Sequence, residues 1–318
     1  MPLLELDAHS AWSNIFNTRG TSRFPRAGSD RLYPFALPET EPSFSISPKS
    51  KIFTMGSCFA RNVEKHLARY DLHIPTIDYF GASEIINKYN PHSMLQEVRQ
   101  ALGLDPVLTP EQRLLKVGDN GWMDLHMHHS VPFDKSDCLH WITQSEKLFQ
   151  EVKNSPYFII TLGLVEVWYD NEIGVYINEP MNFLKYYKDD EEMRRRFMDR
   201  FTFRVLSYDE VYSVIYNMFS LFSDVSSGCK ALLTVSPVAL AGTFTGQDVL
   251  VANTYSKSVL RAAAEAICRK FDFIDYFPSY ESVMLSPRGT TWDDDGVHVR
   301  DEVVALNVRR LVERYVKD

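Results

Sequence analysis

The sequence predicts an α/β protein with three layers, in which helices cover both faces of a parallel sheet. Short apolar runs that end at small residues predict three strands, at residues 51–55, 157–162 and 231–235. Phe59, Val63 and Leu67 recur every four residues after the first run, which predicts an amphipathic helix. A second helix is predicted from about Asn253, as its N-cap. Strands that alternate with helices indicate an α/β/α architecture.

Small or polar residues follow each predicted strand. Ser57, Gly163 and Ser236 stand directly after the three apolar runs or one residue beyond them. A mixed run at 271–277 predicts a fourth strand. Sites of parallel sheets lie outside the carboxyl ends of the strands, so we expect these three residues to converge.

The chain is predicted to be one domain, at 46–318, preceded by an irregular arm over 1–45 that holds Pro, Ser and Arg without periodicity. A charged insertion is predicted at about 170–205. Its acids stand four residues before its bases, at Asp190/Arg194, Glu191/Arg195 and Glu192/Arg196. This spacing favours an exposed helix. The alternative is a basic clamp for an anionic substrate.

Composition narrows the possible functions. The 318 residues are 45% hydrophobic and 24% charged, which is typical of a globular protein, and the net charge is −8. Nucleic acid is therefore not an expected partner. No apolar run reaches the ~18–20 residues of a membrane span, and no secretory signal or C-x-x-C pair is present. We expect a cytoplasmic protein. Without a phosphate-binding or dinucleotide motif, no cofactor is predicted, and the oligomeric state stays open.

The string Gly56-Ser57-Cys58-Phe59-Ala60 joins the first strand to its helix. A serine at this turn presents its hydroxyl at the sheet edge, where the helix N-terminus favours developing negative charge. Ser57 is therefore a candidate nucleophile. The alternative is that Ser57 only caps the helix. Cys58 is interpreted as a packing thiol.

A second pattern, Asp293-Asp294-Asp295-Gly296-Val297-His298, lies near the C-terminus. A nucleophilic serine needs a histidine base, and the base needs a carboxylate that fixes its tautomer. Asp295 and His298 are three residues apart and can meet side chain to side chain. The alternative is an acidic loop with an incidental histidine.

Histidines cluster at 122–130. In a strand, Asp124, His126 and His128 would share one face and His129 the other. A metal site would need a further ligand, so no metal is predicted; a metal-assisted hydrolase that uses residues 126–129 remains an alternative.

The serine turn and the D-x-x-H pattern together resemble the SGNH/GDSL hydrolases, and the chain more specifically resembles the GSCFA family. The strings that carry this resemblance are IFTMGSCFARN at 52–62, TLGLVEVW at 161–168, SKSVLR at 256–261 and YFPSYE at 276–281. It implies an SGNH-hydrolase-like (flavodoxin-like) fold with Ser57 as nucleophile, His298 as base and Asp295 as its orienting acid. It also places His129 in the acyl or sugar pocket.

The resemblance implies an oxyanion hole of three donors. The first is the Ser57 N–H. The second is Gly81, with Asn90 as a rival. The third maps to the block Gly163-Leu164-Val165-Glu166, where Val165 replaces the usual asparagine. Loss of one such donor costs about 10²–10³ in rate in other enzymes. Glu166 is expected to orient a substrate hydroxyl or to cap the pocket.

The resemblance thus implies serine-dependent acyl transfer on O-acyl esters. The protein is expected to be an acyl esterase or an O-acyltransferase that acts on a small-molecule or carbohydrate ester, in particular a bacterial carbohydrate or glycoconjugate. A non-catalytic ligand-binding module on the same fold is the other alternative.

Overall fold

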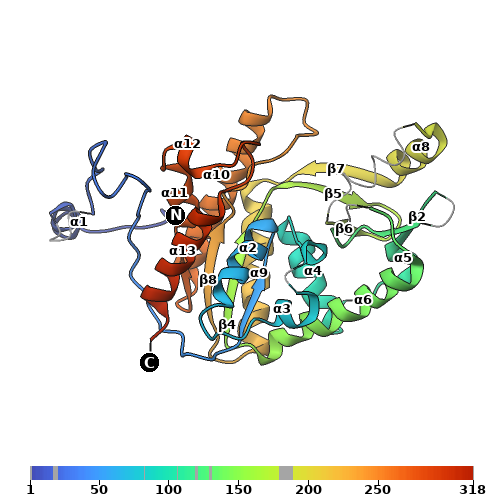
Figure 1. Cartoon of the computed structure of the whole chain (residues 1–318), viewed down its shortest axis with the longest axis horizontal. Helices are drawn as coiled ribbons and strands as arrows, with labels where there is room; N and C mark the ends of the chain where they lie inside the picture. Colours follow the sequence, from blue (N-terminus) through green and yellow to red (C-terminus); the bar gives the residue numbers. More distant parts are fainter. Residues whose placement is uncertain are drawn as a thin grey trace.

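The computed structural model describes residues 2–16, 21–81, 83–105, 107–118, 121–128, 131–178 and 189–317, and it confirms the α/β/α architecture (Figure 1). The central sheet has the order β1 (Ile52–Met55), β4 (Tyr157–Leu162), β8 (Lys230–Val235) and β9 (Ile274–Tyr276). All three pairings are parallel. A single parallel bridge from Lys51 to His73 extends the sheet beyond β1.

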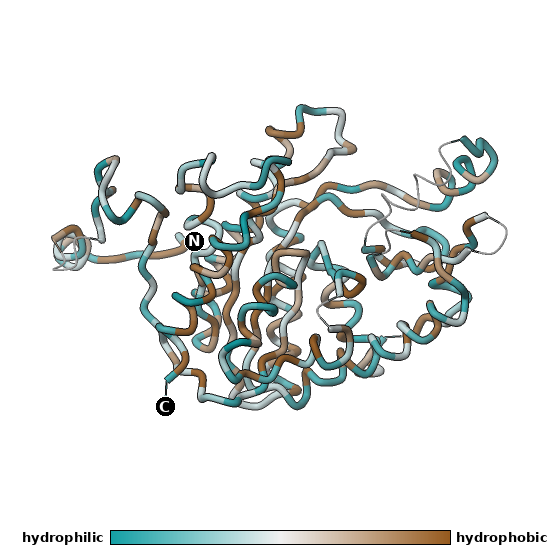
Figure 2. The backbone as a smooth tube through the Cα atoms, viewed as in Figure 1, coloured by the Kyte–Doolittle hydropathy of each residue, from teal (hydrophilic) through white to brown (hydrophobic). Residues whose placement is uncertain are grey.

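Side chains of the sheet alternate between two apolar cores. Phe158 and Ile160 of β4 pack in the larger core, and Ile159 packs in the second. The larger core includes residues of α4 (Pro91–Ala101), α6 (Lys135–Gln150), α9 (Tyr208–Val225) and α10 (Val249–Lys270). The second includes residues of α2 (Cys58–Leu67) and α13 (Asp301–Tyr315). Figure 2 shows the apolar colour concentrated along the strands of the central sheet. Successive side chains of a strand point to opposite faces, so both faces of this sheet are apolar and both are covered by helices.

Short elements complete the main body. They are α3 (Pro75–Phe80), the 3₁₀ helices η1 (Glu84–Ile86) and η2 (Glu151–Asn154), α5 (Pro110–Arg113), α11 (Ser279–Met284) and α12 (Arg288–Thr291). Strands β2 (Leu114–Val117) and β3 (Gly121–Asp124) form an antiparallel pair.

The charged segment belongs to a larger unit than predicted. Strands β5 (Glu166–Asp170), β6 (Val175–Ile177) and β7 (Phe201–Val205) form an antiparallel sheet. The expected exposed helix is α8 (Glu191–Arg200), with an ion pair between Glu192 and Arg196. Arg200 pairs with Asp170 at 2.6 Å, within the unit itself. Trp168 of β5 and Met123 of β3 share a small apolar core, so the pair β2–β3 joins this unit.

Three boundaries differ from the sequence predictions. The arm at 1–45 contains a helix, α1 (Ala8–Ile15), which lies apart from the body (Figure 1). The later part of the arm packs on the body, where Ala36 is buried and hydrogen-bonded to Ser282 and Ser286. Helix α10 begins at Val249, because the Asp248 side chain caps it by accepting the Leu250 N–H at 2.7 Å. Asn253 lies inside the helix, and its Oδ1 accepts the Leu240 N–H at 3.0 Å. The last strand is shortened from the predicted 271–277 to β9, because a turn follows α10, in which the Ile274 N–H donates to the Phe271 carbonyl at 3.2 Å. Within the described residues, none of the helices has both the length and the apolar character that a bilayer crossing requires.

Candidate active site

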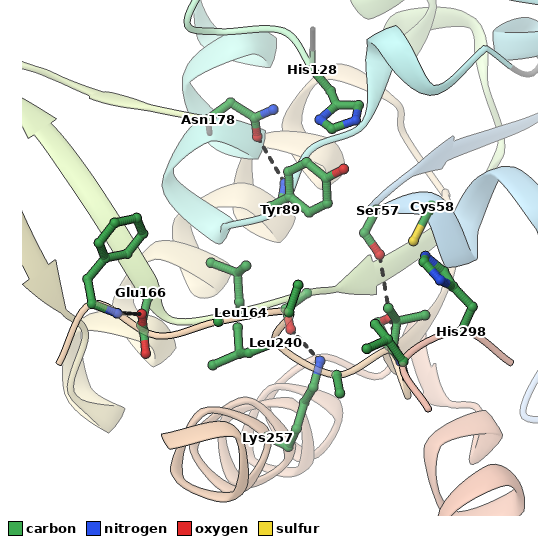
Figure 3. Close-up of a pocket in the computed structure, with 18 of the residues that line it drawn as sticks. Ser57, Cys58, Tyr89, His128, Leu164, Glu166, Asn178, Leu240, Lys257 and His298 are labelled. Atoms are coloured by element: carbon green, nitrogen blue, oxygen red, sulfur yellow. Dashed lines mark hydrogen bonds between the residues drawn. The ribbon is translucent and has the colours of Figure 1, made fainter. Parts of the chain in front are cut away.

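A cavity of about 310 Å³ opens at the carboxyl ends of β1, β4 and β8 (Figure 3). Ser57, Gly163 and Ser236 all line it, as the strand order predicts. The Ser236 N–H donates to the Leu162 carbonyl at 2.8 Å, which fixes the turn after β8 against β4. The topology of the sheet therefore brings together residues about 75 to 180 positions apart in the chain.

Ser57 occupies the N-cap position of α2, but its side chain makes no capping hydrogen bond. Its hydroxyl instead donates to the Ser236 Oγ at 3.4 Å. Ser57 is only 3% exposed, and it lines the cavity. A Cβ at Gly56 would lie 2.8 Å from the Thr161 Cβ, which restricts the preceding position to glycine. The packing thus fixes the serine without using it as a cap.

Asp295 and His298 form the predicted acid–histidine pair. The Asp295 Oδ2 lies 2.5 Å from the His298 Nδ1, and its Oδ1 accepts the N–H groups of Val297 and His298 at 2.8 and 2.9 Å. These hydrogen bonds, chiefly that of the His298 side chain, lower the pKa of Asp295 to about 2. The carboxylate is therefore ionised at neutral pH and orients the imidazole.

Ser57 and His298 line the same cavity, yet no hydrogen bond joins them. About half of the His298 side chain is exposed, at 52%, whereas Ser57 is buried. Of the predicted series Asp295–His298–Ser57, the hydrogen bond between Asp295 and His298 is formed, and the one between His298 and Ser57 is not.

Lys257 is a cavity residue that the sequence analysis missed. It is 2% exposed, and its Nζ donates to the Gly163 carbonyl at 2.7 Å. Burial of the ammonium group lowers the pKa of Lys257 to about 7. The sequence spacing could have indicated that Lys257 is buried. Leu260 and Ala264 of the core follow it by three and seven residues and so lie on the same face of α10.

The block after β4 lies against the cavity as expected. A Cβ at Gly163 would lie 2.5 Å from the Tyr89 carbonyl oxygen, so this close approach requires glycine. Val165 is fully buried; its backbone N–H donates to the Ser256 Oγ at 3.1 Å, and its carbonyl accepts the Leu206 N–H at 2.9 Å. Its side chain offers the cavity no hydrogen-bond donor.

Gly81 and Asn90 do not line this cavity. Gly81 ends α3 with a φ of +58°, and its N–H donates to the Ile77 carbonyl at 2.8 Å. Asn90 caps α4, where its Oδ1 accepts the Ser93 N–H and its Nδ2 donates to the Ile177 carbonyl. Both residues use these polar groups in the local structure of α3 and α4.

Glu166 lines the far end of the cavity (Figure 3). Its carboxylate accepts the Thr243 hydroxyl at 2.5 Å and the Phe244 N–H at 3.2 Å. It therefore holds the loop that connects β8 to α10. Leu240 and Phe244 of this loop line the cavity, and no pattern in the sequence had indicated them.

The histidine cluster does not form a strand face, because β3 ends at Asp124. Asp124 forms an ion pair with Arg113 at 2.7 Å, and the buried His126 ring is hydrogen-bonded to Gln96. His128 lines the cavity, and His129 lies outside the described residues. Among the residues with described positions, no three His, Cys, Asp or Glu side chains gather as metal ligands would.

Cys58 also lines the cavity, beside Ser57 in the chain. Burial raises the pKa of its thiol, with a smaller contribution from Glu84, and so outweighs the helix N-terminus, which would lower it. The thiol is therefore protonated at neutral pH and is a weak nucleophile.

Comparison with known proteins identifies the family of the chain. A search of functionally curated proteins found no match. The sequence model of the GSCFA family matches residues 51–311, which include Ser57, Lys257, Asp295 and His298. With most of its length matched, the chain belongs to the GSCFA family.

Proposed function

We propose that this protein transfers acyl groups from O-acyl esters through an acyl-Ser57 intermediate, as an esterase or an O-acyltransferase of the SGNH kind acting on a carbohydrate or glycoconjugate. The observation that carries the proposal is the Asp295–His298 hydrogen bond of 2.5 Å. His298 lines a cavity that also holds Ser57, a buried serine whose hydroxyl does not cap its helix. An oriented imidazole beside an available hydroxyl is the requirement for nucleophilic catalysis.

The proposed first step is attack of the Ser57 Oγ on the ester carbonyl. The His298 Nε2 takes the hydroxyl proton, since Asp295 holds the Nδ1. His298 then gives this proton to the departing alcohol. A shift of the side chain of Ser57 or of the half-exposed His298 brings the Oγ and Nε2 into contact, as often occurs on substrate binding.

The oxyanion needs positive partners, and Val165 provides none from its side chain. We assign this role to the Ser57 N–H at the start of α2 and to the Lys257 ammonium, which lies against Gly163 in the same cavity. A buried cation interacts strongly with a developing oxyanion because little water screens it. The apolar walls near Leu164, Leu240 and Phe244 receive the acyl chain. The four cysteines are free, and we propose the cytoplasm as the compartment.

The alternative is a binding module on the same fold. The hydrogen bond of Ser57 to Ser236, rather than to His298, is the observation that favours it.

Labelling with a fluorophosphonate, followed by mass spectrometry of the intact protein, tests the proposal. One adduct is expected on Ser57, absent in Ser57→Ala and in His298→Ala. Ser236→Ala is the matched control, because this hydroxyl lies 3.4 Å away in the same cavity, and it is expected to label. An adduct on Ser236 or on Cys58 instead would make the assigned nucleophile wrong. Labelling of none of these residues, together with no Ser57-dependent ester turnover, would favour the binding module.

A further inference from the structure

A second cavity, of about 420 Å³, adjoins the first and shares His128 with it. Residues of α3, η1 and α6 form its walls. The volume lies within the ~300–1,000 Å³ that is typical of small-molecule pockets. The acyl-transfer steps described above do not use this space.

The walls of the second cavity combine aromatic rings with polar groups. Its aromatic residues are Tyr79, Phe80, Phe133 and Trp141. The rings of Phe133 and Trp141 meet edge to face, with centroids 4.5 Å apart. Gln144 and Glu84 add an amide and a carboxylate. The C–H face of a pyranose packs on an aromatic ring, while its hydroxyl groups bond to amides and carboxylates. The first cavity instead offers the aliphatic Leu164 and Leu240 to a flexible chain.

The charge of the second cavity favours a neutral ligand. Glu84 contributes a carboxylate, and the described lining residues include two histidines, His128 and His140, but neither lysine nor arginine. A nucleotide would also stack on aromatic rings, but its phosphates need cationic partners. A neutral sugar ring therefore fits these walls better than a nucleotide does.

His128 connects the two cavities. Its ring meets that of Tyr89 edge to face, with centroids 5.4 Å apart, and Tyr89 lines the first cavity. A ligand seated among the aromatic rings can thus extend a hydroxyl group past His128 toward Ser57. This arrangement separates an acyl-donor half of the site from an acceptor half.

Resting on the proposed function, we infer that the second cavity binds a neutral pyranoside whose hydroxyl group accepts the acyl group from acyl-Ser57. The acceptor oxygen forms a bond to the acyl carbon, and the ester bond to the Ser57 Oγ breaks. His298 takes the proton of the acceptor hydroxyl and returns it to the Ser57 Oγ. Transfer to a sugar then competes with hydrolysis, because the acceptor is held in place and water is not.

The test uses p-nitrophenyl butyrate as donor and methyl glucoside, methyl galactoside and methyl N-acetylglucosaminide as acceptors. Mass spectrometry of the products is expected to show an O-butyryl glycoside with the wild-type protein. Trp141→Ala is expected to reduce this product at least tenfold. Trp12→Ala is the matched control, since Trp12 is 69% exposed on α1 and lies in neither cavity, and it is expected to leave the product unchanged. Gln144→Ala, which removes no ring from the core, is expected to reduce the product as well.

Binding is measured separately, by saturation-transfer NMR of the same glycosides on Ser57→Ala. Signals that Trp141→Ala abolishes and Trp12→Ala retains support the acceptor cavity even when no ester is turned over, in which case the acyl-transfer proposal alone fails. Ester hydrolysis without glycoside binding or transfer would refute the acceptor cavity and leave the esterase. Binding of adenosine monophosphate in place of the glycosides would refute it in favour of a nucleotide.

Discussion

At the scale of single residues, the candidate site contains groups whose ionisation is set by burial and by hydrogen bonds. Lys257 is buried and its pKa falls to about 7, whereas Asp295 is held ionised by the His298 side chain. Because the Lys257 ammonium loses its proton near neutral pH, its electrostatic effect on the oxyanion depends on pH. The serine itself is neutral, so its reactivity depends on these neighbours.

Lys257 gives the first prediction. If its ammonium stabilises the oxyanion, kcat/KM for p-nitrophenyl butyrate should decrease as the pH rises through about 7, because the cation is lost. Lys257→Met should lower kcat/KM about 10²–10³-fold and lack this alkaline decrease. Lys257→Arg, where it folds, should move the decrease to higher pH. The same alkaline decrease in Lys257→Met would contradict the assigned role.

Asp295 gives the second prediction. Asp295→Asn should reduce kcat about 10⁴-fold, because the amide cannot hold the imidazole in the same tautomer. KM should change little, since Asp295 does not line the cavity. Steady-state kinetics on p-nitrophenyl butyrate measure both. Asp294→Asn, an exposed neighbour, is the control and should match the wild type. Equal rates for the two variants would show that the acid–histidine pair is not used.

At the scale of elements, the turn between β4 and β5 links the central sheet to the antiparallel unit. Gly163 lies against the Tyr89 carbonyl and accepts from Lys257, and the Leu164 N–H donates to the same Tyr89 carbonyl at 2.9 Å. Three segments of the chain therefore meet within two residues. A displacement of Gly163 would therefore affect both Lys257 and the cavity wall that Gly163 and Leu164 form.

Gly163→Ala gives the third prediction. The added Cβ would lie 2.5 Å from a backbone oxygen, so the turn must shift, at a cost of about 1–3 kcal/mol in the free energy of unfolding. Denaturant titration measures this loss. Gly242→Ala, in the loop that also lines the cavity but with open space around its Cα, should cost less than about 0.5 kcal/mol. Equal losses would mean that the close approach is not what fixes the turn.

At the scale of the whole molecule, a buried network of charges joins α4 to the pair β2–β3. Lys88 contacts Glu97 at 2.8 Å, and Arg113 contacts Glu97 and Asp124 at 3.4 and 2.7 Å. Burial alone would raise the pKa of Asp124, but Arg113 outweighs it and holds this pKa below its usual value. The network thus stabilises the protein only while its carboxylates are ionised.

Asp124→Ala gives the fourth prediction. It leaves the buried guanidinium of Arg113 without its closest carboxylate, which should lower the free energy of unfolding by about 3–5 kcal/mol. Glu192→Ala breaks a pair whose side chains are about two-thirds exposed and should cost less than about 1 kcal/mol. Denaturant titrations of both variants at pH 7 measure the difference. Comparable losses would show that the network contributes no more than a surface ion pair.

His126 gives the fifth prediction. Burial lowers its pKa from 6.5 to about 4 in the folded protein, so between these values the unfolded chain binds the extra proton. Stability should therefore fall as the pH decreases from about 6.5 to 4, by up to about 1.4 kcal/mol per pH unit. His126→Gln should flatten this part of the profile, measured by denaturant titration at pH 7, 6 and 5. An unchanged slope would assign the acid sensitivity to other groups.

The sequence by itself determined the layers of the fold and the residues at the ends of the strands. The continuous apolar run along 157–162 and the four-residue spacing after Ser57 are local patterns, and they predict local structure reliably. The pairing of Asp295 with His298 was predictable for the same reason, because the two residues are three apart in one turn. The family strings came from the sequence as well.

Tertiary structure alone decided which other groups enter the cavity. Gly81 and Asn90 had suitable chemistry, but their polar groups are used by the ends of α3 and α4. Lys257 lines the cavity because α10 brings its Nζ to the Gly163 carbonyl. Leu240 and Phe244 line it because the loop before α10 is held by Asn253 and Glu166. Such placements depend on contacts between segments distant in the chain. A hydrogen bond to a carbonyl 94 residues away leaves no periodic signal in the sequence, because its energy is determined only when both segments are folded.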